Sequence, residues 1–305
     1  MSDTSNAIDA ANLESVLITG CGYIGTALAE HLLQKRVKVG ALTRNRMQAA
    51  RLIKLGLSEV LVDDLDSDQW HERLRNSYKM VVNCVSSAGG GLVGYQKSYL
   101  EGQRSLLKWA CGAQPDVICY TSSTSVYPQN TGDWVDETAT TEPMTERSSI
   151  LLQAEQLLLQ DKAFMGKKYV VRLGGIYGPG RHYLIDRIKG EEAVLPGGGE
   201  HHMNLVHQED AVRGIIAVLE ASLVNKSDIF NLCDAEPSTQ GEIANWIASR
   251  LQLPCPKFDP MKKSPRMQRS NGSTPDRKIS SKKITNLTKY LPKYPSYKTG
   301  YLELL

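Results

Sequence analysis

The chain has 305 residues, which exceeds a typical single domain and suits one larger domain with a smaller appended lobe. Its net charge of +3, with 23% charged residues, gives no sign of a nucleic-acid-binding surface, so we expect no nucleic-acid partner. The first twelve residues lack the regions of a signal peptide, no apolar run is long enough to cross a bilayer, and the six cysteines lack metal-ligand spacing. We therefore expect a cytoplasmic protein with reduced thiols, no membrane partner and no metal.

Strand and helix patterns alternate through the first half of the chain, which predicts βαβ units and a parallel sheet. The expected strands are 15–19, 37–42, 59–62, 79–85, 116–121 and 168–173. The expected helices are 23–36, 45–55, 67–75, 95–110 and 146–160. Because parallel strands connect by right-handed crossovers, this order favours an α/β fold with a doubly wound parallel Rossmann sheet.

Gly20, Gly22 and Gly25 follow the first apolar strand as Gly-x-Gly-x-x-Gly and open a helical pattern. The first glycine permits a tight turn, the second lets the backbone approach a pyrophosphate, and the third lets the helix pack closely on the strand. The free amides of the helix start, at Tyr23 and Ile24, would point at the phosphates. A glycine-rich turn without a ligand is the alternative, but the strand before it and the amphipathic helix after it favour a dinucleotide site.

The end of the second strand bears on the choice of cofactor. It reads Thr43, Arg44, Asn45, Arg46, with no carboxylate to accept from the ribose hydroxyls of NAD. The two guanidinium groups can pair with a 2′-phosphate in forked geometry, so we predict NADP, with NAD less favoured. The alternative is that both arginines only solvate the start of the next helix.

Two further strand ends should line the dinucleotide. Asp64 and Leu65, after the third strand, are expected at the adenine end, where a carboxylate can accept from the exocyclic amine. Cys84, Val85 and Ser86, after the fourth strand, should line the adenosine and pyrophosphate through their backbone. Together with the glycine turn, these segments predict one continuous cofactor site.

Glycine- and proline-rich loops after the sixth strand mark where a substrate lobe would grow. We assign residues 1–173 to the NADP-binding domain, with later segments near 205–232 contributing, and 174–305 mainly to the substrate lobe. Helices at 208–222 and 239–251 and a strand at 229–232 are expected to alternate between the two parts.

The segment 262–283 is basic and poor in apolar residues. It is expected to be a solvated loop. The alternative is a basic rim that attracts an anionic substrate.

Five segments together resemble the extended branch of the short-chain dehydrogenase/reductase superfamily, the group of NAD-dependent epimerases and dehydratases of nucleotide sugars. These segments are Gly20–Gly25, Tyr120–Tyr127, Val135–Glu137, Arg172–Arg181 and Asn204–Ala211. The resemblance covers nearly the whole chain, although the glycine spacing is one residue shorter than in that group. It implies a small-molecule substrate and a homodimer through the helices 95–110 and 146–160, and it places Gly175 and Ile176 at the cofactor.

The resemblance also implies a catalytic arrangement from which this chain departs. The family serine that bonds the substrate oxygen matches Ser123, but its Tyr-x-x-x-Lys pair becomes Arg147 and Leu151. Arginine stays protonated near neutral pH and leucine cannot hold a ribose hydroxyl. Since acid or base catalysis contributes about a hundredfold to ten-thousandfold, its loss would weaken the family reaction by roughly 3 to 5 kcal/mol. We therefore expect an atypical member.

Other side chains near the expected substrate cleft could take part in the reaction, as proton donors or as binding groups. Ser123, Arg147 and Tyr177 are our predicted catalytic-site residues. Arg147 would stabilise an anionic substrate group or the cofactor phosphate, or else form a salt bridge at its helix start. For Tyr177, as for Tyr127, packing of the lobe against the sheet is the favoured alternative to catalysis.

The histidines of the second half are weaker candidates. His207 precedes an acidic helix start, which favours a capping or hydrogen-bonding role. His201 and His202 follow a glycine loop and are expected to be exposed. They lack the i, i+4 spacing and the nearby carboxylate partner of a zinc site, so no zinc site is predicted there.

Three functions remain open at this point. The first is an NADP-dependent oxidoreductase or an epimerase-like enzyme with a non-standard proton donor, for which reduction of an imine or activated alkene is favoured over alcohol oxidation. The second is a non-catalytic NADP-binding redox sensor or regulatory protein. The third is a structural protein without cofactor, which the intact glycine turn argues against.

Overall fold

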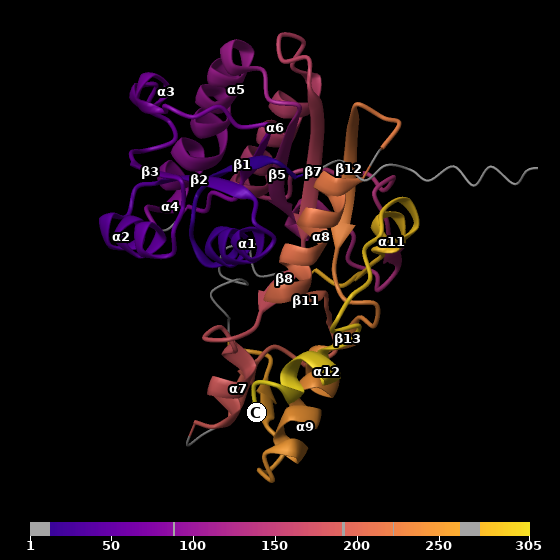
Figure 1. The fold of residues 1–305 in the computed structure, drawn as a ribbon. Helices are drawn as coiled ribbons and strands as arrows, with labels where there is room; N and C mark the ends of the chain where they lie inside the picture. Colours follow the sequence, from indigo (N-terminus) through magenta and orange to yellow (C-terminus); the bar gives the residue numbers. More distant parts are fainter. Residues whose placement is uncertain (1–12, 88, 191–192, 222, 263–274) are drawn as a thin grey trace, which may run out of the picture.

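The computed structural model describes residues 13–87, 89–190, 193–221, 223–262 and 275–305. Its centre is a seven-stranded, all-parallel sheet in the order β12-β7-β5-β4-β1-β2-β3 (Figure 1). The strands are β1 (Ser15–Thr19), β2 (Lys38–Thr43), β3 (Glu59–Val62), β4 (Met80–Asn83), β5 (Val117–Ser123), β7 (Lys167–Leu173) and β12 (Ser227–Leu232). The strand order reverses between β1 and β4, and in such sheets ligands bind outside the carboxyl ends at that point. The predicted doubly wound fold is confirmed.

Helices cover both faces of this sheet. On one face lie α1 (Tyr23–Gln34) and α8 (Gln208–Glu220), which contact each other, and on the other lie α5 (Gly102–Ala113) and α6 (Glu146–Gln160). Successive residues of β1 alternate between the two cores: Val16 and Ile18 face α1, whereas Leu17 faces the α5 side. Such strands are buried on both faces, which explains their nearly continuous apolar sequence.

Most predicted elements of the first half are confirmed with ends shifted by one or two residues, including α2 (Arg46–Lys54) and α3 (Gln69–Arg73). The helix expected at 95–110 differs. It is divided into α4 (Gly91–Tyr95), a π-helical turn at Gln96–Glu101 and α5. Such π-turns often accompany functional sites.

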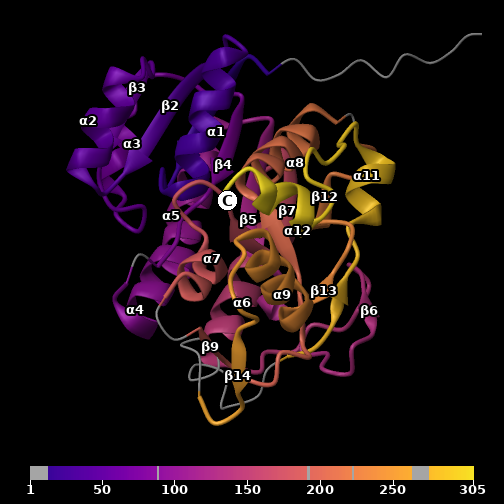
Figure 2. The same ribbon diagram turned by 90° about the horizontal axis from the view of Figure 1, so that it is seen from below.

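The second half of the chain adds a smaller lobe below the carboxyl ends of the sheet (Figure 1, Figure 2). Its own apolar core joins α7 (Tyr183–Ile188), α9 (Gln240–Arg250) and α12 (Tyr297–Leu302). The short strands β8 (Gly175–Tyr177) and β11 (Leu205–His207) pair in parallel between the sheet and this core. The remaining short strands are β6 (Trp134–Val135), β9 (Val194–Pro196), β10 (His202–Met203), β13 (Ser238–Thr239), β14 (Lys257–Asp259) and β15 (Lys278–Ile279).

The predicted solvated loop at 262–283 is wrong at its carboxyl end. Residues 263–274 lie outside the described residues, but Arg277 is buried and β15 pairs in parallel with β6. The helix α11 (Lys282–Leu287) follows. The basic composition suggested side chains that face solvent. Arg277 instead donates to two backbone carbonyls, those of Thr124 and Gln129.

Among the described residues, no helix combines the length and the apolar character needed to span a bilayer.

A buried ion pair joins α6 to the sheet. Arg172 on β7 donates to both carboxylate oxygens of Glu155, with Nη2 to Oε2 at 2.7 Å and Nε to Oε1 at 3.1 Å, and the two side chains are 4% and 2% exposed. Arg172 also donates to the Tyr127 hydroxyl at 2.8 Å, which itself donates to Asn231 Oδ1 at 2.9 Å. Ser122 donates to Glu155 at 2.5 Å. The network fixes the end of β5 against α6 and β12.

Arg172→Met is expected to lower the free energy of unfolding by about 3 to 5 kcal/mol, because it leaves the Glu155 carboxylate buried without its partner. The double variant Arg172→Met with Glu155→Met should recover much of that loss. Arg51→Met, which removes an exposed pair with Glu30, should cost no more than about 1 kcal/mol. Denaturant titrations measure all three, and equal losses for the Arg172 and Arg51 variants would contradict this reading of the network.

Candidate cofactor and substrate site

At two of the three glycines of the turn, neighbouring atoms leave no room for a side chain. At the third, the space is open. A Cβ at Gly20, whose φ is +83°, would lie 2.5 Å from Val85 N, and one at Gly25 would lie 2.6 Å from Gly20 O. A Cβ at Gly22 would have no atom within 4 Å. Gly22 also caps α1 without any side-chain hydrogen bond, so no cap side chain occupies the amide end of the helix. The turn fits a phosphate approaching the backbone at Gly22.

The ends of β1 and β4 are held together below this turn. Cys84 N donates to Thr19 O at 2.7 Å, and Thr19 Oγ1 donates to Asn83 Oδ1 at 3.0 Å. Burial raises the pKa of the Cys84 thiol to about 12, so it stays neutral and acts as a small apolar side chain. Val85 is half-buried and Ser86 is exposed, where the chain leaves β4.

The arginines after β2 are not needed to start α2. Asn45 caps that helix, because its Oδ1 accepts from Met47 N at 2.9 Å and from a second first-turn amide. Thr43 is buried, and its Oγ1 accepts from Asn45 N at 3.3 Å. Arg44 and Arg46 are exposed, and Arg46 forms no ion pair within the described chain.

Arg44 connects two of the predicted cofactor segments. Its Nη2 donates to the carbonyl of Ser87 at 3.2 Å, so the side chain runs from the end of β2 toward the segment after β4. The side chain as a whole is exposed, so its other guanidinium donors can reach a ligand. A phosphate bound there would meet a charge that is already positioned.

The two residues predicted at the adenine end differ in exposure. Asp64 is exposed and makes no ion pair with the described residues, whereas its neighbour Asp63 pairs with Arg73 at 2.8 Å. Leu65 is buried in the core on the α5 side, and its carbonyl accepts from Trp70 Nε1 at 3.3 Å. Asp64 is therefore the member of the pair that is open to a ligand.

Ser123 lies at the carboxyl end of β5. It is half-buried, and its Oγ accepts from Ser125 N at 3.2 Å, which leaves its own proton for another acceptor. Leu151, at the family lysine position, is 4% exposed and packs with Val126 and Tyr127. The helix that carries the family pair is thus kept, but the lysine position now holds a leucine that packs in the core.

Arg147, at the family tyrosine position, lies in the first turn of α6. Its guanidinium stacks over the ring of Tyr95, with 5.1 Å between Cζ and the ring centroid. It is half-buried and forms no ion pair with the described residues, so the structure does not show the alternative salt bridge. Thr145 and Ser148 cap the helix through a reciprocal pair of hydrogen bonds, which leaves Arg147 unused by the helix start.

Tyr127 and Tyr177 both have packing roles in the structure. The Tyr127 hydroxyl is committed to the Arg172 network. Tyr177 is 3% exposed and stacks on Tyr301, with 4.6 Å between ring centroids. Its hydroxyl has no hydrogen-bonding partner among the described residues, and burial raises its pKa, so we do not retain it as a proton donor.

Two histidines of the second half have different roles: His207 caps a helix, and His202 pairs with a carboxylate. His207 Nδ1 accepts from Glu209 N at 3.3 Å at the start of α8, which confirms the capping role. His202 is not simply exposed, as the sequence suggested. Its Nδ1 lies 2.7 Å from Oδ1 of Asp276, a carboxylate 74 residues away that no local spacing indicates.

Gly175 and Ile176 lie on β8, which leaves the main sheet just after β7. Gly175 is exposed and Ile176 is half-buried, and they pair with Leu205 and Val206 of β11. This pairing brings the segment that begins at His202 to the carboxyl end of the sheet.

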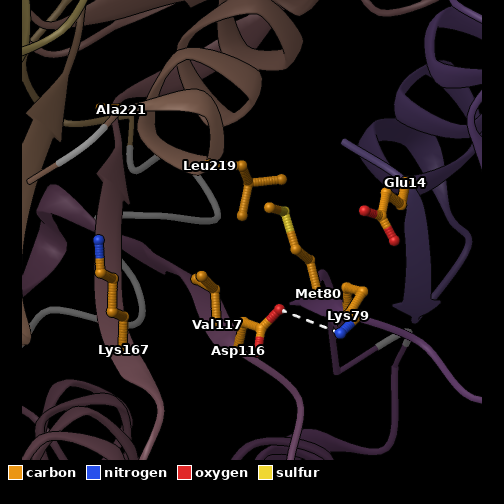
Figure 3. Close-up of a pocket in the computed structure, with 8 residues that line it drawn as sticks. All are labelled: Glu14, Lys79, Met80, Asp116, Val117, Lys167, Leu219 and Ala221. Carbon is orange, nitrogen blue, oxygen red and sulfur yellow. Dashed lines mark ion pairs between the residues drawn. The ribbon is translucent and has the colours of Figure 1, made fainter. Parts of the chain in front are cut away.

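A cavity of about 290 Å³ lies at the other end of the sheet (Figure 3). Six of its lining residues precede or begin strands, and the other two, Leu219 and Ala221, lie at the end of α8. The lining residues are Glu14, Lys79, Met80, Asp116, Val117, Lys167, Leu219 and Ala221. Ligands of such folds bind at the carboxyl ends, so this cavity is separate from the glycine turn. Within the described ranges, no group of three or more His, Cys, Asp or Glu side chains could hold a metal ion.

Several known proteins are similar to this chain along most of its length. Protein YeeZ of Escherichia coli strain K12 is 28% identical over 260 residues, which cover 81% of this chain and 87% of YeeZ. The decarboxylating sterol-4-alpha-carboxylate 3-dehydrogenase of Dictyostelium discoideum is 25% identical over 240 residues, covering 73% and 72%.

Solved structures show the same fold. MoeE5 in complex with UDP-glucose and NAD superimposes with a TM-score of 0.78 at 19% identity, covering 94% of this chain and 96% of that one. A conserved protein of unknown function from Silicibacter pomeroyi gives a TM-score of 0.76 at 24% identity, covering 95% and 98%. Residues 16–233 match the NAD dependent epimerase/dehydratase family. The chain belongs to that family.

Proposed function

We propose that the protein binds NADP at the glycine turn and is an oxidoreductase or epimerase-like enzyme that acts on a small anionic substrate with a proton donor other than the family tyrosine. The observation that carries the proposal is a glycine turn with an uncovered Gly22 at the start of α1, together with the exposed guanidinium of Arg44, which is anchored on Ser87 O. When bound, a nicotinamide dinucleotide supplies the hydride chemistry. The protein supplies binding, orientation and protons.

Support for NADP comes from the charges around the adenosine end of the crevice. Arg44 is anchored on Ser87 O at 3.2 Å, and Arg46 lies beside it at the start of α2. A ribose 2′-phosphate accepts forked hydrogen bonds from guanidinium groups, whereas the hydroxyl of NAD would leave them unpaired. MoeE5 was solved with NAD, so this preference would distinguish the chain from that protein.

Support for an anionic substrate comes from Arg147. By its place in the family frame, this side chain faces the substrate from the first turn of α6, where the helix dipole also favours negative charge. Stacking on Tyr95 fixes the guanidinium plane without using its hydrogen-bond donors. Ser123 offers a hydroxyl to the substrate oxygen. The sterol dehydrogenase from Dictyostelium is named for a carboxylate substrate.

Arg44→Asp is expected to weaken NADPH binding at least about tenfold, because a charge-assisted hydrogen bond contributes about 1.5 to 3 kcal/mol and a like charge replaces it. NADH affinity should change by less than about threefold. Fluorescence titrations of the wild type and the variant measure both. Arg75→Asp, an exposed substitution before β4, is the matched control for the charge change. Tighter binding of NADH than of NADPH by the wild type would contradict the proposal.

Arg147→Met is expected to remove a preference for anionic substrates. Consumption of NADPH would be measured with pairs of carbonyl and imine compounds that differ only in a carboxylate or its amide. The ratio of kcat/KM for carboxylate over amide should fall about tenfold or more in the variant. Arg104→Met, which removes an exposed pair with Glu101, should leave the ratio unchanged.

An unchanged ratio in Arg147→Met would remove the assigned role of this residue. Tight NADPH binding without turnover of any pair would instead support the non-catalytic sensor, which the loss of a polar side chain at Leu151 favours.

A further inference from the structure

We propose that His202, held by Asp276, is the proton donor of this site and replaces the absent family tyrosine. The inference rests on the proposed function, because a proton donor has a role only where a hydride is transferred. It is carried by a histidine–carboxylate pair that the fold assembles from two distant segments beside the predicted substrate cleft.

The pair has the geometry of an oriented acid or base. Asp276 Oδ1 accepts from His202 Nδ1 at 2.7 Å and from His202 N at 2.8 Å, so one carboxylate oxygen holds both the ring and its backbone. An ionised carboxylate only accepts, which makes Nδ1 the protonated nitrogen and leaves Nε2 as the exchanging atom. Nε2 has no partner among the described residues. The side chains are 23% and 31% exposed, so protons can be exchanged with solvent.

Two anchors place the pair at the substrate side of the sheet. On one side, the chain from His202 runs directly into β11, whose Leu205 pairs with Gly175. On the other side, Arg277, next to Asp276, donates to Thr124 O at 3.1 Å, one residue after Ser123. These contacts connect the segments that carry His202 and Asp276 to β8, where the family resemblance places the cofactor, and to the turn that follows Ser123.

A third contact locks these anchors together. Asn204 donates to Arg277 O at 2.9 Å and accepts from Ile279 N at 2.7 Å. The Asn204 side chain thus ties the segment after β10 to the backbone of β15. The approach of His202 to Asp276 is supported by these side-chain to backbone bonds as well as by the pair itself, as preorganised catalysis requires.

Among the described residues, several titratable groups neighbour the pair, including Arg277 next to Asp276 in the chain. They also include His201 on the same segment as His202 and Glu242 on α9, whose carboxylate is bound to the cap residue Thr239. Burial opposes ionisation of Asp276, but hydrogen bonds from the His202 backbone and ring outweigh it and hold the pKa of Asp276 below its usual value. Asp276 is therefore a carboxylate near neutral pH, and it accepts from His202 Nδ1 and orients the ring.

The chemical step balances with a reduced nicotinamide as hydride donor. A carbon–oxygen or carbon–nitrogen double bond of the substrate takes the hydride at carbon, and its electron pair moves to the oxygen or nitrogen. That atom takes the proton from His202 Nε2. The imidazole becomes neutral with Nδ1–H still bound to Asp276, and it recovers a proton from solvent.

The first test uses the wild-type protein with isotope-labelled histidine and nuclear magnetic resonance. Neutral His202 should show the Nδ1–H tautomer. Saturation with NADP⁺ should shift its Cε1–Hε1 signal, whereas 2′-phospho-ADP-ribose, which lacks the nicotinamide, should not. His182, whose Nδ1 lies 2.8 Å from Oδ1 of Asp186 at the start of α7, is the matched control and should move with neither ligand. His202→Asn provides the assignment of the signal.

The second test uses variants. His202→Asn should lower NADPH-consuming turnover about a hundredfold or more, with the NADPH dissociation constant within about twofold of wild type, whereas His182→Asn should change neither. Asp276→Asn should lower kcat more than it raises KM and should shift the neutral tautomer of His202 toward Nε2–H, a signature that a merely structural role of Asp276 would not give.

The outcomes separate the inference from the proposed function. If NADP⁺ binds but leaves the His202 signal in place, or if His202→Asn turns over at the wild-type rate, His202 is not the donor and the cofactor proposal stands. If neither NADP⁺ nor NADPH binds, the proposed function fails and the inference falls with it.

Discussion

The close approach of two strand ends is the constraint on which the rest of the site depends. Gly20 lies so near Val85 that a single added carbon would come within 2.5 Å of the backbone nitrogen, and this contact sets β1 and β4 side by side where the strand order reverses. The same turn leaves Gly22 uncovered at the start of α1. A helix start whose amides no side chain caps is what a phosphate group requires.

Around that crevice the chain keeps the frame of its family and changes the groups within it. The Arg172–Glu155 network holds α6 against the sheet, so the positions of Arg147 and Leu151 are fixed although neither carries out the family chemistry. Leucine at the lysine position adds to the core, and arginine at the tyrosine position exchanges a proton donor for a permanent charge. This pattern favours anion binding at α6, and in the proposed function the proton comes from another element.

Sequence patterns predicted the sheet, the glycine turn and the cap at His207, because strand periodicity and turn chemistry are local properties. They did not predict the π-turn before α5 or the burial of Arg277, since both depend on contacts with distant segments. The His202–Asp276 pair was missed for the same reason: its partners are 74 residues apart and meet only through the pairing of short strands in the lobe. Composition misled at Arg277, a buried basic residue whose guanidinium donates to two backbone carbonyls.

The most direct test of the central claim is calorimetry with NADPH on the wild type and on Gly22→Ala. The added methyl group meets no atom of the protein and φ at this position is negative, so the variant should unfold within about 1 kcal/mol of wild type. The account predicts heat of binding for the wild type and an affinity at least about tenfold lower for the variant, because the methyl group occupies the path of the pyrophosphate. Equal binding by both proteins, or no heat with the wild type, would contradict it.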